Sequence, residues 1–262
     1  MIFFSLPIKL RIPSNCRLTY ADNDYVHAAI LKAISNVDSD VGQWIHDNQW
    51  AKPVAIGLLL KQPAAPILRM TVMADEGARL SNLLVKTFAT NPELRLGAVK
   101  CMVESVDLNC PVWGGLSTWA NLMNETGSHL NFDFITPTAI MKKGSSDRRF
   151  SSLLPEPGDV FAGLWRRWTR LGGPPLPEIQ DYIADGGCVI SRLNLRTIGF
   201  RTPQRVQIGF IGQVRYELRG DEQHFAQALT ALTRFARFAG VGYQTARGMG
   251  IVRTTIERRN NW

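Results

Sequence analysis

Hydrophobic and polar positions divide the first half of the chain into short strands and helices. Leu6, Ile8 and Leu10 alternate with polar or proline positions, which is the period of a strand with one buried face. The same reasoning predicts strands over residues 53–60, 67–73 and 99–106, and helices over residues 25–35, 41–46 and 76–88. The order of these elements is that of the ferredoxin-like fold.

The second half repeats this order less regularly. Its apolar stretches predict a strand over residues 131–141, broken at 136–138, then helices over 159–170 and 176–184 and a strand over 205–218. Gly209 and Gly212 are expected to mark a bulge or bend in that last strand. An amphipathic stripe predicts a helix over residues 225–236, and a final strand follows over 250–256. We therefore predict an α+β protein of two tandem ferredoxin-like domains, residues 1–130 and 131–262.

The composition is that of a folded protein with an uneven charge. The chain has 262 residues, of which 45% are hydrophobic, so it can bury a core and is not disordered. Residues 1–130 hold 11 basic and 11 acidic side chains, whereas residues 131–262 hold 19 basic and 11 acidic ones. The whole net charge of +8 therefore lies in the second half and favours a nucleic acid as partner. A merely basic protein is the alternative that charge alone leaves open.

Cysteine spacing and the length of apolar runs exclude other classes of protein. The four cysteines form no CxxC pair and are too few for a disulfide framework: Cys16, Cys101, Cys110 and Cys188. The longest apolar run, residues 54–60, is far shorter than the roughly 20 residues that cross a bilayer. The N-terminus also lacks the charge order of a signal peptide. We expect a cytoplasmic protein that does not associate with membranes.

The most informative segment is a glycine-rich loop between the last predicted helix and the last predicted strand. Its glycines permit positive φ angles and a close approach of the backbone to a ligand: Gly240, Gly242, Gly248 and Gly250. The order helix–loop–strand is the reverse of a dinucleotide-binding fingerprint, and no Gly-Lys-Ser/Thr of a P-loop is present. We predict that the loop follows a phosphate chain, with Tyr243, Gln244 and Arg247 as further contacts. The alternative is a helix C-cap followed by turn glycines.

This loop and three other segments resemble a known family. The G-x-G-x5-G-x-G pattern after the last helix of a ferredoxin-like domain is similar to the hallmark of the repeat-associated mysterious protein superfamily. Within it, the chain resembles the CRISPR-associated endoribonucleases that cut precursor CRISPR RNA within its repeats. The other matching segments are Phe134-Ile-Thr-Pro-Thr138 and residues 161–168 and 208–216. The resemblance implies CRISPR repeat RNA as partner; other CRISPR effector subunits and a second copy of the chain stay open as further partners.

The chemistry is expected to depend on a lone histidine. The sequence shows no metal-binding pattern, and RNA supplies its own nucleophile, the 2′-hydroxyl, so we predict neither metal nor cofactor. The expected products are a 2′,3′-cyclic phosphate and a 5′-hydroxyl. The resemblance implies that His46 is the general acid or base, because the family's catalytic histidine precedes a Lys-Pro and the second strand. Lys52 is predicted to stabilise charge on the phosphate, and Tyr25 to orient the 2′-hydroxyl.

The remaining candidates are assigned by their surroundings in the sequence. His27 is expected to pack within a helix, His129 to lie in a linker, and His224 to begin the last helix. The residues predicted to contact RNA phosphates are Lys142, Lys143, Arg148, Arg149, Arg166, Arg167 and Arg192.

Two other functions stay open at this point. A non-catalytic RNA-binding subunit of a CRISPR ribonucleoprotein would keep the glycine loop and the basic half but would not need His46. A scaffold that binds only proteins would leave both features without a purpose. RNA affinity that falls steeply with ionic strength would exclude the scaffold, because phosphate contacts release counterions.

Overall fold

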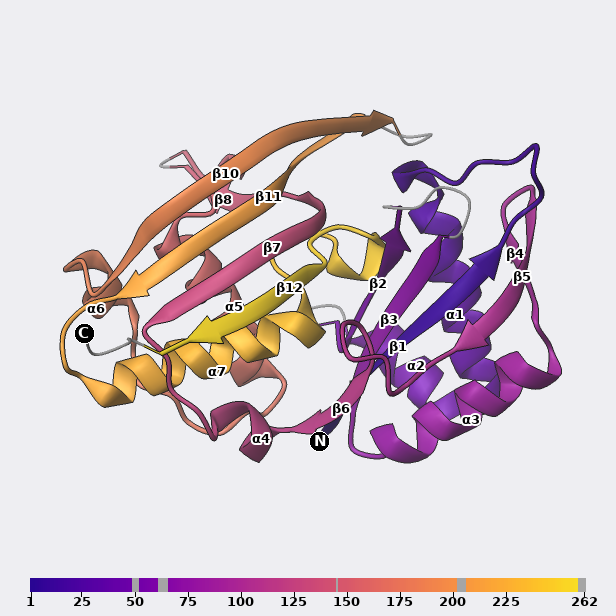
Figure 1. The fold of residues 1–262 in the computed structure, drawn as a ribbon, viewed down its shortest axis with the longest axis horizontal. Coiled ribbons are helices and arrows are strands. Elements are labelled where there is room, and N and C mark those ends of the chain that lie inside the picture. Colours follow the sequence, from indigo (N-terminus) through magenta and orange to yellow (C-terminus); the bar gives the residue numbers. More distant parts are fainter. Residues whose placement is uncertain (49–51, 61–65, 145, 202–205, 259–262) are drawn as a thin grey trace. The chain divides into compact units, whose positions relative to one another are not determined.

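The computed structural model describes residues 1–48, 52–60, 66–144, 146–201 and 206–258 (Figure 1). The chain forms two compact units. Unit 1 contains Met1–Thr118, Phe200–Gln207 and Gln244–Gly248, and unit 2 contains Trp119–Gly199, Ile208–Tyr243 and Met249–Trp262. The division therefore falls after Thr118 instead of after residue 130, and two short segments of the second half belong to unit 1.

Unit 1 is built on an antiparallel sheet in the order β2-β3-β1-β5-β4 (Figure 1). The strands are β1 (Ile2–Arg11), β2 (Val54–Leu59), β3 (Ile67–Ala74), β4 (Glu93–Leu96) and β5 (Val99–Val106). A further strand, β6 (Gly115–Thr118), also pairs with β1. All four strands predicted from alternation are present, whereas β4 and β6, of only four residues each, are not evident from the sequence.

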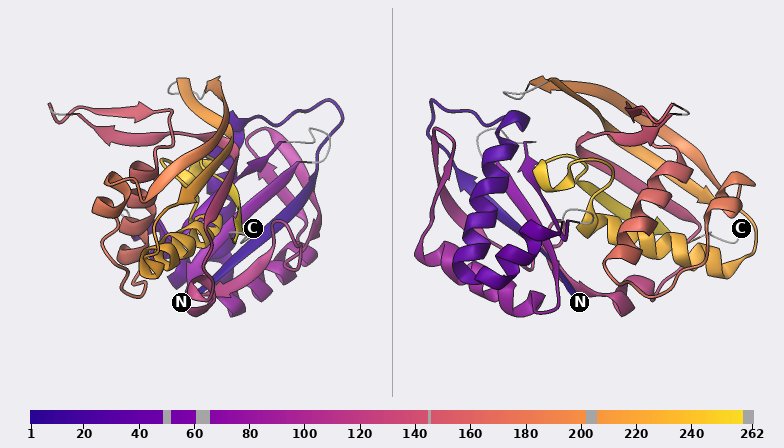
Figure 2. Two further views of the ribbon diagram at one scale, coloured as in Figure 1. Left: turned by 60° about the vertical axis from the view of Figure 1, so that its left-hand side comes forward. Right: turned by 180° about the vertical axis from the view of Figure 1, so that it is seen from behind.

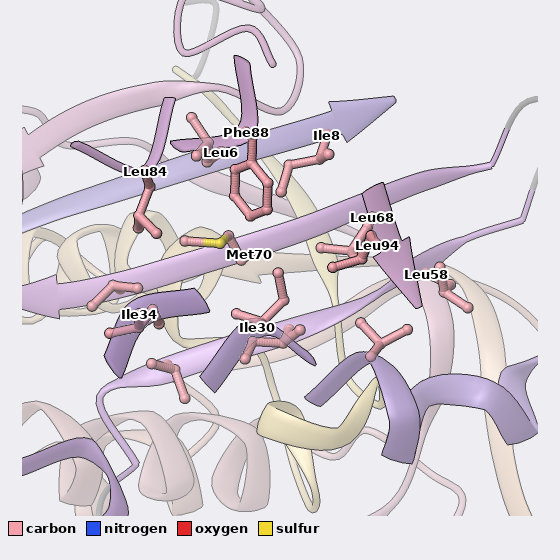
Figure 3. Packing of buried hydrophobic residues seen from close by; sticks show 14 of the residues in the cluster. Leu6, Ile8, Ile30, Ile34, Leu58, Leu68, Met70, Leu84, Phe88 and Leu94 are labelled. Atoms are coloured by element: carbon pink, nitrogen blue, oxygen red, sulfur yellow. The ribbon is translucent and has the colours of Figure 1, made fainter. Parts of the chain in front are cut away.

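Three helices cover one face of this sheet (Figure 2). They are α1 (Asn23–Val37), preceded by the 3-10 turn η1 (Tyr20–Asp22), α2 (Ser39–Asp47) and α3 (Gly77–Thr90). Val26, Ile30 and Ile34 lie four residues apart on α1 and are fully buried. Figure 3 shows the core that they enter; its labelled side chains are Leu6, Ile8, Ile30, Ile34, Leu58, Leu68, Met70, Leu84, Phe88 and Leu94. Complete burial of each such side chain contributes roughly 1.5–3 kcal/mol to stability.

The other face of β1 is buried as well, which the sequence does not suggest. Phe3 and Ser5 are fully buried on that face, where β6 pairs with residues Ile2–Ser5. The Ser5 hydroxyl donates to the Trp113 carbonyl and accepts from Arg69 Nε at 3.0 Å. The Arg69 guanidinium lies 5.5 Å from the centre of the Trp113 ring, within the range of a cation–π contact. The alternation that predicted one buried face holds only toward the end of β1, where Lys9 and Arg11 are exposed, whereas residues 3–5 are buried on both faces.

Unit 2 has the sheet order β10-β11-β7-β12 (Figure 1). The strands are β7 (His129–Thr138), β10 (Cys188–Arg201), β11 (Val206–Leu218) and β12 (Val252–Glu257). Helices α5 (Pro157–Arg170), α6 (Gln180–Ala184) and α7 (Gln223–Ala239) are the predicted ones, and α4 (Trp119–Met123) precedes β7. Both units thus have the ferredoxin-like strand order, and the predicted fold class is confirmed.

Three features of unit 2 differ from the sequence-based prediction. β7 continues through residues 136–138 without a break and ends before Ala139. Its last residues are held by hydrogen bonds from the segment before β12: the Ile251 N–H donates to the Thr136 hydroxyl, and the Gly250 N–H donates to the Pro137 carbonyl. Strand β10 does not follow from the sequence, since nine of its fourteen residues are exposed. The segment that carries Lys142, Lys143, Arg148 and Arg149, for which no strands were predicted beyond residue 141, is a hairpin of β8 (Ile140–Lys143) and β9 (Arg149–Ser152). The bulge predicted at Gly212 is present, as the pairing with β7 shifts there.

Within the described residues, no helix is long and apolar enough to cross a membrane.

Candidate active site

The glycine-rich loop needs its glycines for conformational reasons. Gly240, Gly242, Gly248 and Gly250 have φ angles of 72°, 82°, 88° and 71°, in the region that other residues rarely adopt. Gly240 also ends α7, as its N–H donates to the Ala236 carbonyl, so the C-cap interpretation holds for this residue. A Cβ on Gly242 would lie 2.4 Å from the Ala139 carbonyl oxygen. The loop conformation therefore depends on the glycines that the sequence singled out.

The tip of this loop, Gln244–Gly248, belongs to unit 1. It forms the 3-10 turn η2 (Thr245–Arg247), and Ala246 enters the hydrophobic core of unit 1. A Cβ on Gly248 would lie 2.0 Å from the side-chain amide carbon of Asn23, at the start of α1. Asn23 is itself held by hydrogen bonds to the Tyr20 carbonyl and from the Leu58 N–H. The loop tip is thus packed against α1 and β2.

Arg247 is placed by this packing beside α1. Its guanidinium lies 3.3 Å from the Asp24 carboxylate, and its side chain remains 55% exposed. An exposed ion pair of this kind contributes about 0–1 kcal/mol, so Asp24 directs Arg247 more than it stabilises the fold. The remaining guanidinium donors are available to a ligand.

His27 lies one helical turn after Asn23 and Asp24, on the same face of α1. It forms a hydrogen bond with the backbone of Ala246, while its Nδ1 is buried without a hydrogen-bond partner among the described residues. Desolvation lowers the pKa of His27, and the charges of Arg247 and Lys52 add to this effect. The prediction of simple helix packing missed this contact. The spacing Asn23, Asp24, His27 is the signal that could have revealed it.

His46 and Lys52 meet at the C-terminal end of α2. Lys52 Nζ donates to the carbonyls of Ile45 at 3.1 Å and His46 at 2.8 Å, which satisfies the end of the helix. The His46 side chain is 75% exposed, and its Nδ1 lies 3.3 Å from Asp47 Oδ1. Desolvation lowers the pKa of Lys52, opposed by the nearby Asp47 charge and assisted by that of Arg247. An exposed imidazole and an ammonium group therefore lie at one helix end.

Tyr25 lies apart from these groups. It is on α1 and 47% exposed, and its ring covers Gly97 in the turn between β4 and β5, where a Cβ would lie 2.9 Å from it. In the described part of the chain it has no interaction with His46 or Lys52. Charge interactions thus link Lys52 with Asp47, Arg247 and His27, and Tyr25 is not among these groups.

The basic residues predicted in unit 2 fall into two groups. Lys142 pairs with Glu156 at 2.9 Å and Asp159 at 2.6 Å, and Lys143 pairs with Asp147 at 2.8 Å. Ion pairs within the unit therefore occupy both lysines. By contrast, the following side chains are exposed and have no partner among the residues described: Arg148, Arg149, Arg166 and Arg192.

Arg167 has a different environment from the other predicted phosphate contacts. Its guanidinium donates to the Ala239 carbonyl, close to the end of α7. Burial lowers its pKa to about 10, because the charged form loses hydration. This arginine supports the start of the glycine loop from within unit 2, so the expectation of an exposed phosphate contact does not fit it.

Among the described ranges, no group of three or more His, Cys, Asp or Glu side chains is placed to hold a metal ion.

Comparison with known proteins points to one family. Residues 132–252, which include the glycine loop, match the sequence profile of the CRISPR-associated endoribonuclease Cas6. A solved Cas6 (TTHA0078) product complex superimposes with a TM-score of 0.79 and 27% identity, over 97% of this chain and 100% of that chain. The chain is thus similar to the Cas6 family. Both matches support an endoribonuclease of CRISPR RNA processing, which is the function that the resemblance implied.

Two further Cas6 structures share the fold of this chain. The Thermus thermophilus Cas6 (TTHB231) product complex has a TM-score of 0.81 and 22% identity, over 97% of this chain and 99% of that one. A Cas6 (TTHA0078) substrate mimic complex has a TM-score of 0.75 and 24% identity, over 97% of this chain and 100% of that one. No curated protein sequence gives a significant match to the chain.

Proposed function

We propose that this Cas6-like protein cleaves precursor CRISPR RNA within its repeats without a metal ion. The 2′-hydroxyl next to the scissile phosphate attacks phosphorus, and the bond from phosphorus to the 5′-oxygen breaks. The products are a 2′,3′-cyclic phosphate and a 5′-hydroxyl. The observation that supports the proposal is the hydrogen bond from Lys52 Nζ to the His46 backbone carbonyl, at the helix end that carries the imidazole.

His46 moves one of the two protons in this reaction, and solvent exchanges the other. Imidazole suits this work because its ordinary pKa of about 6.5 lies close to cellular pH. The exposure of its side chain leaves the ring open to a large substrate. Asp47, at 3.3 Å from Nδ1, orients the ring and favours proton transfer at the other nitrogen.

Lys52 stabilises the negative charge that develops on the phosphate oxygens. Its Nζ donates to the carbonyls of Ile45 at 3.1 Å and His46 at 2.8 Å, and the phosphate is proposed to bind at the same ammonium group. This anchoring fixes the ammonium before RNA arrives, so little reorganisation is needed in the transition state. Tyr25 is 47% exposed on the neighbouring helix and is proposed only to contact RNA outside the reacting atoms.

The glycine loop binds the RNA backbone. Arg247 exchanges the Asp24 carboxylate for a phosphate, and Tyr243 and Gln244 contact the adjacent nucleotide. Positive φ angles at Gly242 and Gly248 hold the chain in the turn that presents these side chains. Arg148, Arg149, Arg166 and Arg192 contribute phosphate contacts from unit 2.

The test is cleavage of a labelled cognate repeat RNA in EDTA. His46→Ala is expected to lower the single-turnover rate by at least about a hundredfold, since general acid–base catalysis contributes that much. His224→Ala, at the start of α7, is the matched control and should cleave like the wild type. A 2′-deoxy substitution at the scissile nucleotide should abolish cutting.

Other outcomes separate the alternatives. Tight binding without cutting by the wild type would indicate a non-catalytic RNA-binding subunit. Loss of cutting in EDTA, restored by a divalent cation, would replace the metal-free mechanism. Undiminished cutting by His46→Ala would move the proton-transfer role to another residue.

A further inference from the structure

The hairpin of β8 and β9 in unit 2 carries Arg148 and Arg149, which the proposed function uses only as general phosphate contacts. It projects from the helices and sheet of unit 2 (Figure 2, left). The two strands pair antiparallel from Ile140 opposite Ser152 to Lys143 opposite Arg149. Backbone hydrogen bonds from Gly144 N–H to the Arg148 carbonyl, at 2.9 Å, and from Asp147 N–H to the Gly144 carbonyl close its end. The hairpin is therefore an ordered element of the unit.

Its two lysines hold the hairpin in place. Lys142 reaches Glu156 and Asp159 at the start of α5, and hydrogen bonds to these carboxylates raise its pKa. Lys143 pairs with Asp147 across the end of the hairpin. These contacts anchor the strands, and they also remove both lysines from the set of cations available to a ligand.

Three consecutive side chains do not anchor the hairpin in this way: Arg148, Arg149 and Phe150. Arg148 and Arg149 are exposed and have no partner in the described part of the chain. Phe150 pairs across the strands with Lys142 and is 50% exposed, whereas Ile140, on the same face, is only 6% exposed. An aromatic ring is thus held in solvent beside two free guanidinium groups.

We propose that this hairpin binds a single-stranded segment of the RNA. Phe150 stacks on an unpaired base, and Arg148 and Arg149 contact the phosphates on either side of it. Because every base has a flat aromatic face, such stacking accepts any sequence, but the base must first leave its duplex stack. The inference rests on the proposed function, since it assigns a further contact to the same RNA.

The distribution of charge and apolar groups favours RNA over a protein partner. Residues 140–152 carry four basic side chains and one acidic side chain. The other exposed apolar residue of the two strands, Met141, lies on the opposite face from Phe150, so the hairpin offers no continuous apolar patch. A protein interface would need such a patch at its centre, whereas a stacked base needs one ring.

The test is binding of a fluorescein-labelled single-stranded RNA, which contains the repeat and its flanks, measured by anisotropy. Phe150→Ala is expected to raise Kd between roughly 5-fold and 100-fold, and Phe150→Trp should restore the affinity. Leu154→Ala is the control, because Leu154 is equally exposed at 54% but lies outside the hairpin. The double variant Arg148→Gln/Arg149→Gln should reduce the salt slope by about 1.4, or 0.7 per phosphate.

The outcomes distinguish this inference from the proposed function. If Phe150→Ala binds like the wild type while His46-dependent cutting persists, the hairpin contact is overturned and the nuclease mechanism stands. If Phe150→Ala instead changes only the oligomeric state of the protein and leaves RNA affinity unchanged, the hairpin binds a second copy of the chain, and the inference is also overturned. If the wild type binds no RNA, both proposals fail together. An unchanged melting temperature of each variant confirms that it is folded.

Discussion

Units 1 and 2 share one order of strands but obtain their functional residues from different places. In unit 1, the polar groups of the candidate site lie at helix ends and on a loop tip that returns from late in the chain, as with Lys52 and Arg247. In unit 2, the basic residues predicted to contact RNA lie on the β8–β9 hairpin, on β10 and on α5. The same fold thus supports a compact cluster in one unit and a spread of cations in the other.

The comparison also shows that net charge does not tell how many basic side chains are available to bind phosphate. The excess of basic residues lies in the second half of the chain, yet many of them are already paired there. Arg215 pairs with Glu257, Arg253 with Asp133, and Lys142 with two carboxylates. A phosphate that binds such a residue must first displace a carboxylate. The unpaired arginines are therefore the better candidates for RNA contacts.

The largest effect is expected from a substitution that disrupts the packing of the loop tip, residues 244–248, within unit 1. Gly248→Ala should lower the free energy of unfolding by about 2–4 kcal/mol, since the positive φ is unfavourable for alanine and the new Cβ overlaps Asn23. Gly163→Ala on α5 is the matched control, because a Cβ there meets nothing within 4 Å. Urea unfolding measures both. An unchanged midpoint for Gly248→Ala would mean that the loop tip does not pack on α1.

A smaller effect is the pH dependence that His27 adds to unit 1. Its folded pKa lies below the ordinary value, so below about pH 6.5 the unfolded chain takes up a proton that the folded unit resists. Stability from this residue is complete above that pH and falls as the pH is lowered toward the folded pKa. His27→Gln should remove this part of the acid sensitivity, whereas His129→Gln is the comparison. Melting temperatures between pH 7.5 and 5 test it, and parallel curves for His27→Gln and the wild type would contradict it.

The smallest effect concerns the Asp24–Arg247 pair. If RNA displaces Asp24 from Arg247, then Asp24→Asn removes a competitor worth about 0–1 kcal/mol and tightens RNA binding by up to roughly fivefold. Asp181→Asn on α6 makes the same change of charge away from Arg247 and serves as the control. Weaker binding by Asp24→Asn would show instead that the carboxylate holds Arg247 in the orientation that RNA requires.

Structural features that depend on residues close in the sequence could be predicted, whereas contacts between residues far apart in the sequence could not. The strands and helices with regular periodicity follow from the sequence, because burial of one face imposes that period. The exposed edge strand β10 does not, since its main reason to be extended is its hydrogen bonding to β11. His46 was singled out by the family resemblance, and Lys52 as a cation that follows it; Lys52 donates to the His46 backbone carbonyl, and the roles of both residues stay predictions.

Other parts of the site required the tertiary structure. Arg247 and Asp24 are 223 positions apart, and no local pattern joins them. His27 was set aside because a helical histidine beside apolar residues usually packs in a core, and only the return of Ala246 to α1 gives it another contact.

The sequence by itself determined which residues are glycines with special backbone needs, where the regular elements lie, and where the positive charge accumulates. These properties are local or additive, so they can be read position by position. Only the tertiary structure decided which cations are neutralised, which ring is left in solvent, and which histidine meets the glycine loop. Each of these depends on distant segments meeting in space, and such pairs leave no period in the sequence.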